Sequence, residues 1–108
     1  MAFSKADQYA PDEQMVSSYF KTIGHPARQR ILRQLKESGI MTVEELRKGH
    51  PLCEATMSWH LKCLRILHLI EANEEFPYTY YHMDRKEVER ARKMINEFFD
   101  FLLWGELE

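Results

Sequence analysis

The sequence predicts a mainly α-helical domain with one small β-hairpin, in the order α-α-α-α-β-β-α, and three observations support this fold class. Apolar residues recur with helical spacing from residue 12 to residue 67. The period then changes to short runs rich in aromatic residues, as is typical of strands. Helical spacing returns from residue 85 to residue 104. Because 108 residues is about the length of one domain, we expect residues 1–108 to form a single domain.

The N-terminal part is expected to be an arm followed by a helix. Residues 1–11 are polar and unpatterned, so we predict a flexible arm. Residues 12–23 place their apolar side chains on one helical stripe, and Gly24 ends this helix as its C′ residue. The stripe consists of Met15, Val16, Tyr19, Phe20 and Ile23.

The second predicted helix is marked by its boundary residues. Pro26 after His25 opens it, because proline at the first helical position loses no hydrogen bond, and Gly39 closes it. Three aliphatic residues form its core face, whereas its arginines stay outside: Ile31, Leu32 and Leu35 against Arg28, Arg30 and Arg33.

The third predicted helix is short, 43–48, and begins with a capping box. In this arrangement Thr42 and Glu45 each accept a hydrogen bond from a free backbone N–H group of the other. Gly49-His50-Pro51 ends the helix. A longer helix, 54–67, follows, with its apolar residues on one face: Met57, Leu61, Leu64 and Leu67.

Two strands and a last helix complete the prediction. The strands are 69–72 and 78–83, and residues 73–77 form the hairpin loop between them. Asp84 and Glu87 make a second possible capping box, which starts the last helix, 85–104.

This order of elements is that of a winged helix-turn-helix. In that fold, a short helix, a turn and a second helix form the unit that enters the DNA major groove, and the hairpin is the wing. The charge distribution agrees, although the whole chain carries a net charge of −2. Residues 21–65 hold nine Lys and Arg against four Glu, so the positive charge is concentrated around the predicted DNA-binding unit.

Three separated motifs add a specific resemblance. Residues 21–35 (KTIGHPARQRILRQL), 55–64 (ATMSWHLKCL) and the strand ending in Tyr80-Tyr81-His82-Met83 resemble the opening segment, the recognition helix and the wing of the ArsR/SmtB family. The resemblance covers roughly residues 15–100. It implies homodimers that repress promoters until an effector releases them.

The recognition helix supplies most of the expected DNA contacts. Its short polar residues allow close approach to base edges, and its basic residues suit phosphates. Trp59 either contacts DNA or packs under the wing, and His60 is expected to support helix packing or to contact phosphate. The predicted contact set is Arg47, Lys48, Glu54, Ala55, Thr56, Ser58, Trp59, His60, Lys62 and Arg65.

The wing departs from the resemblance. Family wings commonly carry basic residues, but residues 71–77 contain three glutamates and no Lys or Arg. Carboxylates would repel the phosphate backbone. We therefore predict a wing that stays off the DNA or meets another protein.

No metal or cofactor is expected. The family's Cys-x-Cys type site corresponds to Val43-Glu44-Glu45-Leu46 here, and residues 85–103 contain no His for the site on the last helix. Cys53 and Cys63 are separated by about 15 Å of helical rise, which is too far for a disulfide. A modified thiol, a small molecule, a partner protein or no effector at all remain open.

The last helix has more apolar surface than one small core needs, so we expect it to form a dimer interface with the first helix. The dimerisation helices are thus 12–23 and 85–104. The predicted interface is Met15, Val16, Tyr19, Phe20, Ile95, Phe98, Phe99, Leu102 and Leu103. A two-fold dimer implies a near-palindromic double-stranded DNA site.

The sequence argues against an enzyme and a membrane protein. It has no Gly-rich phosphate loop, no nucleophile elbow and no evident acid–base pair, and its five His residues lie on different elements. No apolar run approaches the length of a membrane span, and no secretory signal is evident, so we expect a cytoplasmic protein. The rival interpretation is a winged-helix module that binds proteins instead of DNA.

Overall fold

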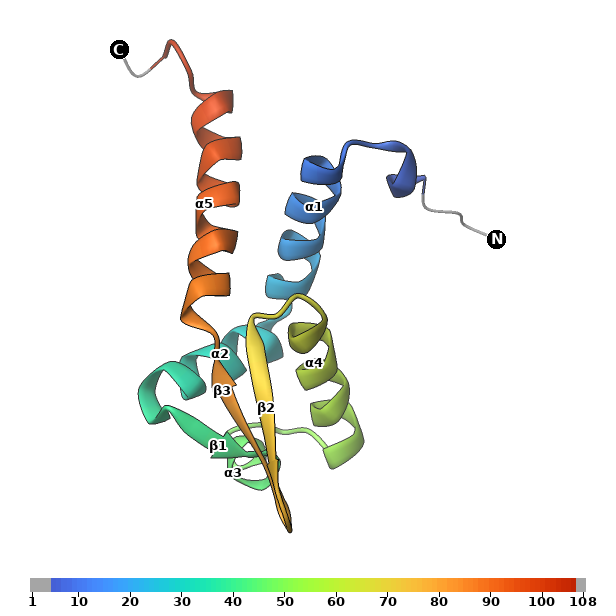
Figure 1. Ribbon diagram of the computed structural model, residues 1–108, viewed down its shortest axis with the longest axis vertical. Helices are drawn as coiled ribbons and strands as arrows, with labels where there is room; N and C mark the ends of the chain where they lie inside the picture. Colours follow the sequence, from blue (N-terminus) through green and yellow to red (C-terminus); the bar gives the residue numbers. More distant parts are fainter. Residues whose placement is uncertain (1–4, 107–108) are drawn as a thin grey trace.

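The computed structural model describes residues 5–106 and has the predicted order of helices, with one additional strand (Figure 1). The elements are η1 Ala6–Gln8, α1 Pro11–Ile23, α2 Pro26–Ser38, β1 Ile40–Thr42, α3 Val43–Arg47, α4 Glu54–Ile66, β2 Ile70–Glu75, β3 Tyr78–Met83 and α5 Arg85–Leu102. Helices α1 and α5 extend from one end of the molecule, and the β2–β3 hairpin projects from the opposite end (Figure 1).

The first helix begins and ends close to its predicted limits, with one correction at its C-terminus. Gly24 caps α1 with a φ of −68°, which is right-handed and not the left-handed C′ conformation expected from the sequence. Gly39, by contrast, ends α2 with a φ of 84°, which favours glycine. The predicted arm contains the short helix η1, and its residues 1–4 lie outside the described part of the chain.

The sheet has three antiparallel strands in the order β1-β3-β2, so the prediction of two strands was incomplete. Strand β1 pairs with β3, with Ile40 opposite His82 and Thr42 opposite Tyr80. Three residues are too few to show the alternation that marks a strand in a sequence. The pairing partner, which lies about forty residues later in the chain, therefore defines β1.

The hairpin loop is shorter than predicted. Strand β2 continues through Asn73 and Glu74 to Glu75, which pairs with Tyr78, so only Phe76 and Pro77 lie between the strands. Asn and Glu have low intrinsic strand preference, which made this segment look like a loop. Pairing with the aromatic strand β3 overrides that preference.

Asp84 caps α5, but the second capping box is not reciprocal. Its carboxylate accepts hydrogen bonds from the backbone N–H groups of Lys86 and Glu87 at 3.1 and 3.2 Å. The backbone N–H of Asp84 donates instead to the carbonyl of Leu69, at 2.9 Å. The start of α5 is thereby tied to the segment just before β2.

The core lies where α2, α3 and α4 pack against the start of β2, the C-terminal half of α1 and the N-terminal half of α5. Its fully buried side chains come from every one of these elements, namely Tyr19, Ile31, Leu35, Leu46, Met57, Leu61, Leu64, Leu69, Ile70 and Ala91. The spacing of apolar residues on α2 and α4 predicted this burial. Tyr19 was assigned to the dimer interface and is instead 1% exposed, so it belongs to the core of the single chain.

Candidate nucleic-acid interface

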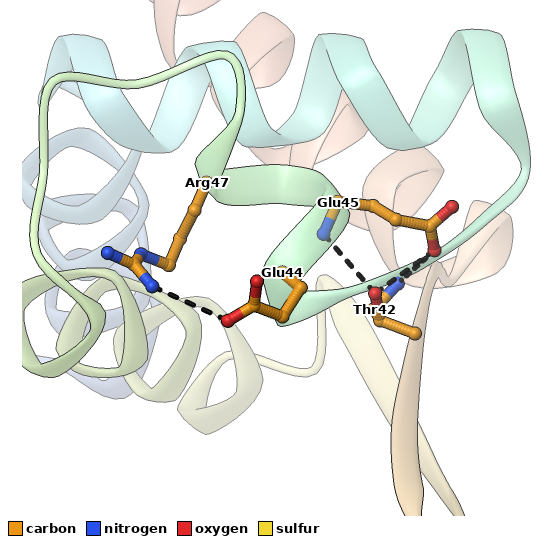
Figure 2. Close-up of polar contacts among 4 residues, drawn as sticks. All are labelled: Thr42, Glu44, Glu45 and Arg47. Atoms are coloured by element: carbon orange, nitrogen blue, oxygen red, sulfur yellow. Dashed lines mark hydrogen bonds and ion pairs between the residues drawn. The ribbon is translucent and has the colours of Figure 1, made fainter.

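The helix-turn-helix begins at the predicted capping box (Figure 2). The Thr42 backbone N–H donates to Glu45 Oε1 at 2.9 Å, and the Glu45 backbone N–H donates to Thr42 Oγ1 at 3.2 Å. These bonds favour the carboxylate, so the pKa of Glu45 is lowered, first by the backbone bond to Thr42. The box fixes the start of α3 although the helix has only five residues.

Helix α4 carries the exposed face that the sequence predicted. Its inward side is buried and aliphatic around Met57, Leu61 and Leu64. Trp59 is 54% exposed, so it does not pack under the wing as the alternative interpretation required. The structure leaves most of the predicted contact residues of α4 exposed, namely Glu54, Ala55, Thr56, Ser58, Trp59, Lys62 and Arg65.

His60 is the exception among the predicted contact residues of α4. It is only 5% exposed and faces α2, where its Nδ1 accepts a hydrogen bond from Arg28 Nε at 3.2 Å. The imidazole therefore has no route to a DNA backbone on the outer face of α4. Including His60 in the contact set was a mistake, although the expected packing role agrees with its position.

The turn between α3 and α4 is held by side chains of α2. Arg30 Nη1 donates to the carbonyl of Gly49 at 2.9 Å, and Gln34 Nε2 donates to the carbonyl of Leu46 at 3.1 Å. Gln34 Oε1 lies 2.8 Å from His50 Nε2. A Cβ atom on Gly49 would lie 2.6 Å from Gln34 Nε2, so any other residue there would make the Gln34 side chain shift.

Sequence reasoning missed this set of turn contacts. The polar residues of α2 gave no periodic signal, because a hydrogen bond to a backbone carbonyl depends on which loop lies beside the helix. The only local hint was glycine next to His50.

Burial, followed by the nearby charge of Arg30, lowers the pKa of His50, so the neutral ring is favoured in its contact with Gln34.

The two basic residues predicted on α3 and its C-terminus differ in environment. Arg47 Nη1 lies 3.5 Å from Glu44 Oε1 (Figure 2), and the Arg47 side chain is only 32% exposed. Its Nε is buried and has no hydrogen-bond partner within residues 5–106. Lys48 is exposed. Lys48 is therefore the more accessible of these two cations, whereas the Arg47 guanidinium is held near Glu44.

Cys53 occupies the N-cap position of α4, beside the exposed polar residues. Its Sγ lies 3.3 Å from Thr56 Oγ1, and this side-chain hydrogen bond, followed by the backbone bond to Thr56, lowers the pKa of the Cys53 thiol. Cys63 is half-buried farther along the same helix. The two thiols therefore sit in unlike environments.

The wing is acidic and exposed. Glu74, Glu75 and Phe76 are all exposed at its tip, and Phe76 is fully accessible. Glu71, near the base, lies 3.5 Å from the ring nitrogen of His68. The carboxylates of Glu74 and Glu75 are thus exposed to solvent, and neither forms an ion pair with another residue of the described range 5–106.

Helices α1 and α5 flank an open groove of about 1020 Å³, whose lining combines apolar side chains such as Val16 and Phe20 with charged ones such as Glu13, Arg90 and Lys93. Phe20 and Phe98 line this groove, and their rings meet each other and the ring of Phe99 edge to face, with centroid separations of 5.5–6.1 Å. The last turns of α5 and the two residues that follow it leave a run of exposed apolar side chains, namely Phe98, Phe99, Phe101, Leu102, Leu103 and Trp104. Met15 and Ile95, which were predicted at the interface, are half-buried against the core.

Among residues 5–106, no group of three His, Cys, Asp or Glu side chains gathers in a way that could hold a metal ion. None of the helices in that range is long and apolar enough to cross a membrane.

The comparisons with known proteins agree on the kind of protein. No protein-family model matches the sequence. An uncharacterized HTH-type transcriptional regulator of Methanocaldococcus jannaschii is 33% identical over 82 residues, which make up 72% of this chain and 88% of that protein.

Solved structures establish the fold. The ArsR-like transcriptional regulator from Rhodococcus sp. RHA1 superposes with a TM-score of 0.69 at 17% identity, over 82% of each chain. A second structure, of an ArsR family transcriptional regulator, superposes with a TM-score of 0.72 at 16% identity, over 84% of this chain and 93% of the other. The predicted winged helix-turn-helix is confirmed.

Proposed function

We propose that this chain, which belongs to the HTH-type transcriptional regulators, a group of DNA-binding proteins and not enzymes, is a homodimeric repressor of the ArsR type, whose fold it shares. The proposed site is a near-palindromic duplex into which each protomer inserts the outer face of α4. Because such a protein must share a compartment with its DNA, we propose a cytoplasmic location.

The exposed face of α4 is the observation that carries the proposal. Thr56 and Ser58 offer hydroxyl groups to base edges or phosphates, and the methyl groups of Ala55 and Thr56 suit the methyl group of thymine. Glu54 is an acceptor for cytosine N4. Lys62 and Arg65 suit phosphates on either side, and they position the helix without specifying sequence.

Dimerisation is supported by the exposed aromatic surface of α1 and α5. Monomeric proteins rarely leave so large a contiguous apolar surface in water. Two copies related by a two-fold axis would bury Phe20, Phe98 and Phe99 against each other and hold two α4 helices about 34 Å apart. Repression itself rests on the similarity to ArsR-type regulators.

The proposal includes no metal site of the family type. Helix α3 has Val43-Glu44-Glu45-Leu46 where a Cys-x-Cys type motif would stand, and carboxylates alone are poor ligands for zinc-like ions. The releasing signal would therefore be of another kind.

DNA binding can be tested through one phosphate contact. In fluorescence anisotropy with random duplex DNA at two salt concentrations, we expect Lys62→Ala to weaken binding and to reduce the slope of log K against log[salt] by about 1. Lys36→Ala is the matched control, because Lys36 is also exposed but lies near the C-terminal end of α2. Selection of preferred sequences should enrich an inverted repeat. Absence of binding at low salt would favour the protein-binding module, for which the acidic wing is the supporting observation.

A second prediction concerns the wing, which we propose stays off the DNA. The affinity of the double variant Glu74→Lys/Glu75→Lys for random duplex DNA should be no higher than that of the control double variant Glu37→Lys/Glu106→Lys. Both double variants change the net charge by the same amount, so long-range attraction is matched. A clear rise specific to the wing variant at low salt would place the wing tip near phosphates.

A further inference from the structure

A histidine pair and an arginine join the recognition helix to the start of α2. His60 of α4 is buried, and its ring lies 4.4 Å from the ring of His25, the N-cap of α2, with an interplanar angle of 47°. Arg28 donates from Nε to His60 Nδ1 at 3.2 Å and from Nη1 to the carbonyl of Thr22 at 3.4 Å. Arg28 therefore links the end of α1 to α4.

The hydrogen bond fixes the protonation state of His60. A guanidinium has only N–H donors and stays protonated at every relevant pH, so Arg28 must be the donor. The Nδ1 atom of His60 must then carry a lone pair, with the ring proton on Nε2. A protonated imidazole has two N–H donors and no acceptor. Protonation would therefore replace this bond with two opposed donors and two adjacent positive charges.

The other groups that face His60 oppose protonation as well. They are His25 and Arg28 from the start of α2, and His50 from the segment between α3 and α4. No carboxylate within the described residues 5–106 forms an ion pair or hydrogen bond with His60. A proton on His60 thus has no counter-charge to stabilise it, and the contact between α2 and α4 loses its polar bond.

We infer that the Arg28–His60 contact positions the recognition helix against α2 and that protonation of His60 releases it, so that mild acidification weakens DNA binding by this chain. The inference rests on the proposed function, because α4 must be the element that meets DNA. His60 is a positioning residue, which acts through the placement of α4 and without touching the duplex.

The direction of the pH effect follows from the environment of His60. Burial, and then the charges of His25, Arg28 and His50, lower the pKa of His60 below its ordinary value of 6.5. The unfolded chain then binds the proton more readily than the folded chain between pH 6.5 and the lower folded pKa. The contribution of His60 to stability is complete above pH 6.5 and is lost as the pH falls through that window.

The test compares the pH dependence of DNA affinity between pH 8 and pH 5 in the wild type and in His60→Gln. Glutamine keeps an oxygen that accepts from Arg28 but does not titrate. When the uptake of one proton is coupled to the loss of DNA binding, the affinity changes by at most about tenfold per pH unit. We expect the DNA affinity of the wild type to fall as the pH is lowered below 6.5, by no more than this factor per pH unit. In His60→Gln the affinity should depend less steeply on pH. His68→Gln, which changes an exposed histidine, should keep the wild-type slope.

Measurements on the free protein separate this inference from the proposed function. The NMR titration of the His60 ring should have its midpoint below pH 6.5, and Arg28→Gln should move that midpoint upward because a neighbouring charge is gone. If no DNA binds at any pH, the proposed function fails and the ring titration still decides whether the contact responds to protons. A midpoint at or above 6.5, or an unchanged slope in His60→Gln, overturns the inference.

Discussion

Replacing Leu61 with alanine should lower the free energy of unfolding by about 2–5 kcal/mol, the range for a leucine truncated in a tightly packed core. Leu61 is 1% exposed on the inner face of α4, among buried side chains from α2, α3 and the sheet. The substitution removes buried apolar contacts and leaves a cavity that the surrounding helices cannot fully close. Because a domain of this size has a total stability of roughly 5–15 kcal/mol, this loss would be a large part of the free energy that keeps the chain folded.

Urea unfolding followed by circular dichroism measures this effect, at one fixed protein concentration because a dimer gains stability by mass action. The matched control is Ile66→Ala on the same helix. Ile66 is 63% exposed, so its truncation leaves no internal cavity, and alanine has the higher helix propensity. We expect that variant to stay within about 0.5 kcal/mol of the wild type. Equal losses in the two variants would mean that the inner face of α4 is not the packed side.

Replacing Phe98 with glutamate should convert the proposed dimer into a monomer. Phe98 is 41% exposed and meets the rings of Phe20 and Phe99 at 6.1 and 5.5 Å between centroids. At the centre of a two-fold interface, each copy would bury an unpaired carboxylate among aromatic rings. Loss of a central aromatic anchor costs at least about 2 kcal/mol of binding energy, so the dimer Kd should rise by about 30-fold or more.

Light scattering and sedimentation at micromolar concentration distinguish the two states. The control Phe76→Glu introduces the same carboxylate at the fully exposed wing tip, where we expect no change in assembly. Circular dichroism should show that Phe98→Glu keeps its helices, because Phe98 lies outside the buried core. A wild-type chain that is monomeric under these conditions, or a Phe98→Glu variant that remains dimeric, would contradict the proposed interface.

The sequence predicted the elements whose signals are local. The apolar spacing of α4 identified its buried face, because side chains one helical turn apart must share a side. The Thr42–Glu45 capping box predicted the start of α3, because both partners lie within one helical turn. The exposed positions of Thr56, Ser58 and Lys62 followed from the same periodicity.

The features that the sequence did not predict depend on partners far along the chain. Strand β1 is visible only beside β3, and β2 reaches Glu75 only because Tyr78 pairs with it. The burial of Tyr19 within the single chain was missed for the same reason. Its side chain belongs to the same apolar stripe of α1 as the residues predicted at the dimer interface. Periodicity says that a residue faces inward but does not say whether the partner is the same chain or another.

The sequence by itself therefore determined the kind of protein: the order of helices and hairpin, the outer face of the recognition helix and the acidic wing. The tertiary structure decided how that helix is held. Arg28, Arg30 and Gln34 all belong to α2, yet they bond to His60 and to the backbone of the turn between α3 and α4. Such bonds join residues that become neighbours only when the helices pack, because hydrogen bonds require close distance and direction, which no sequence pattern encodes.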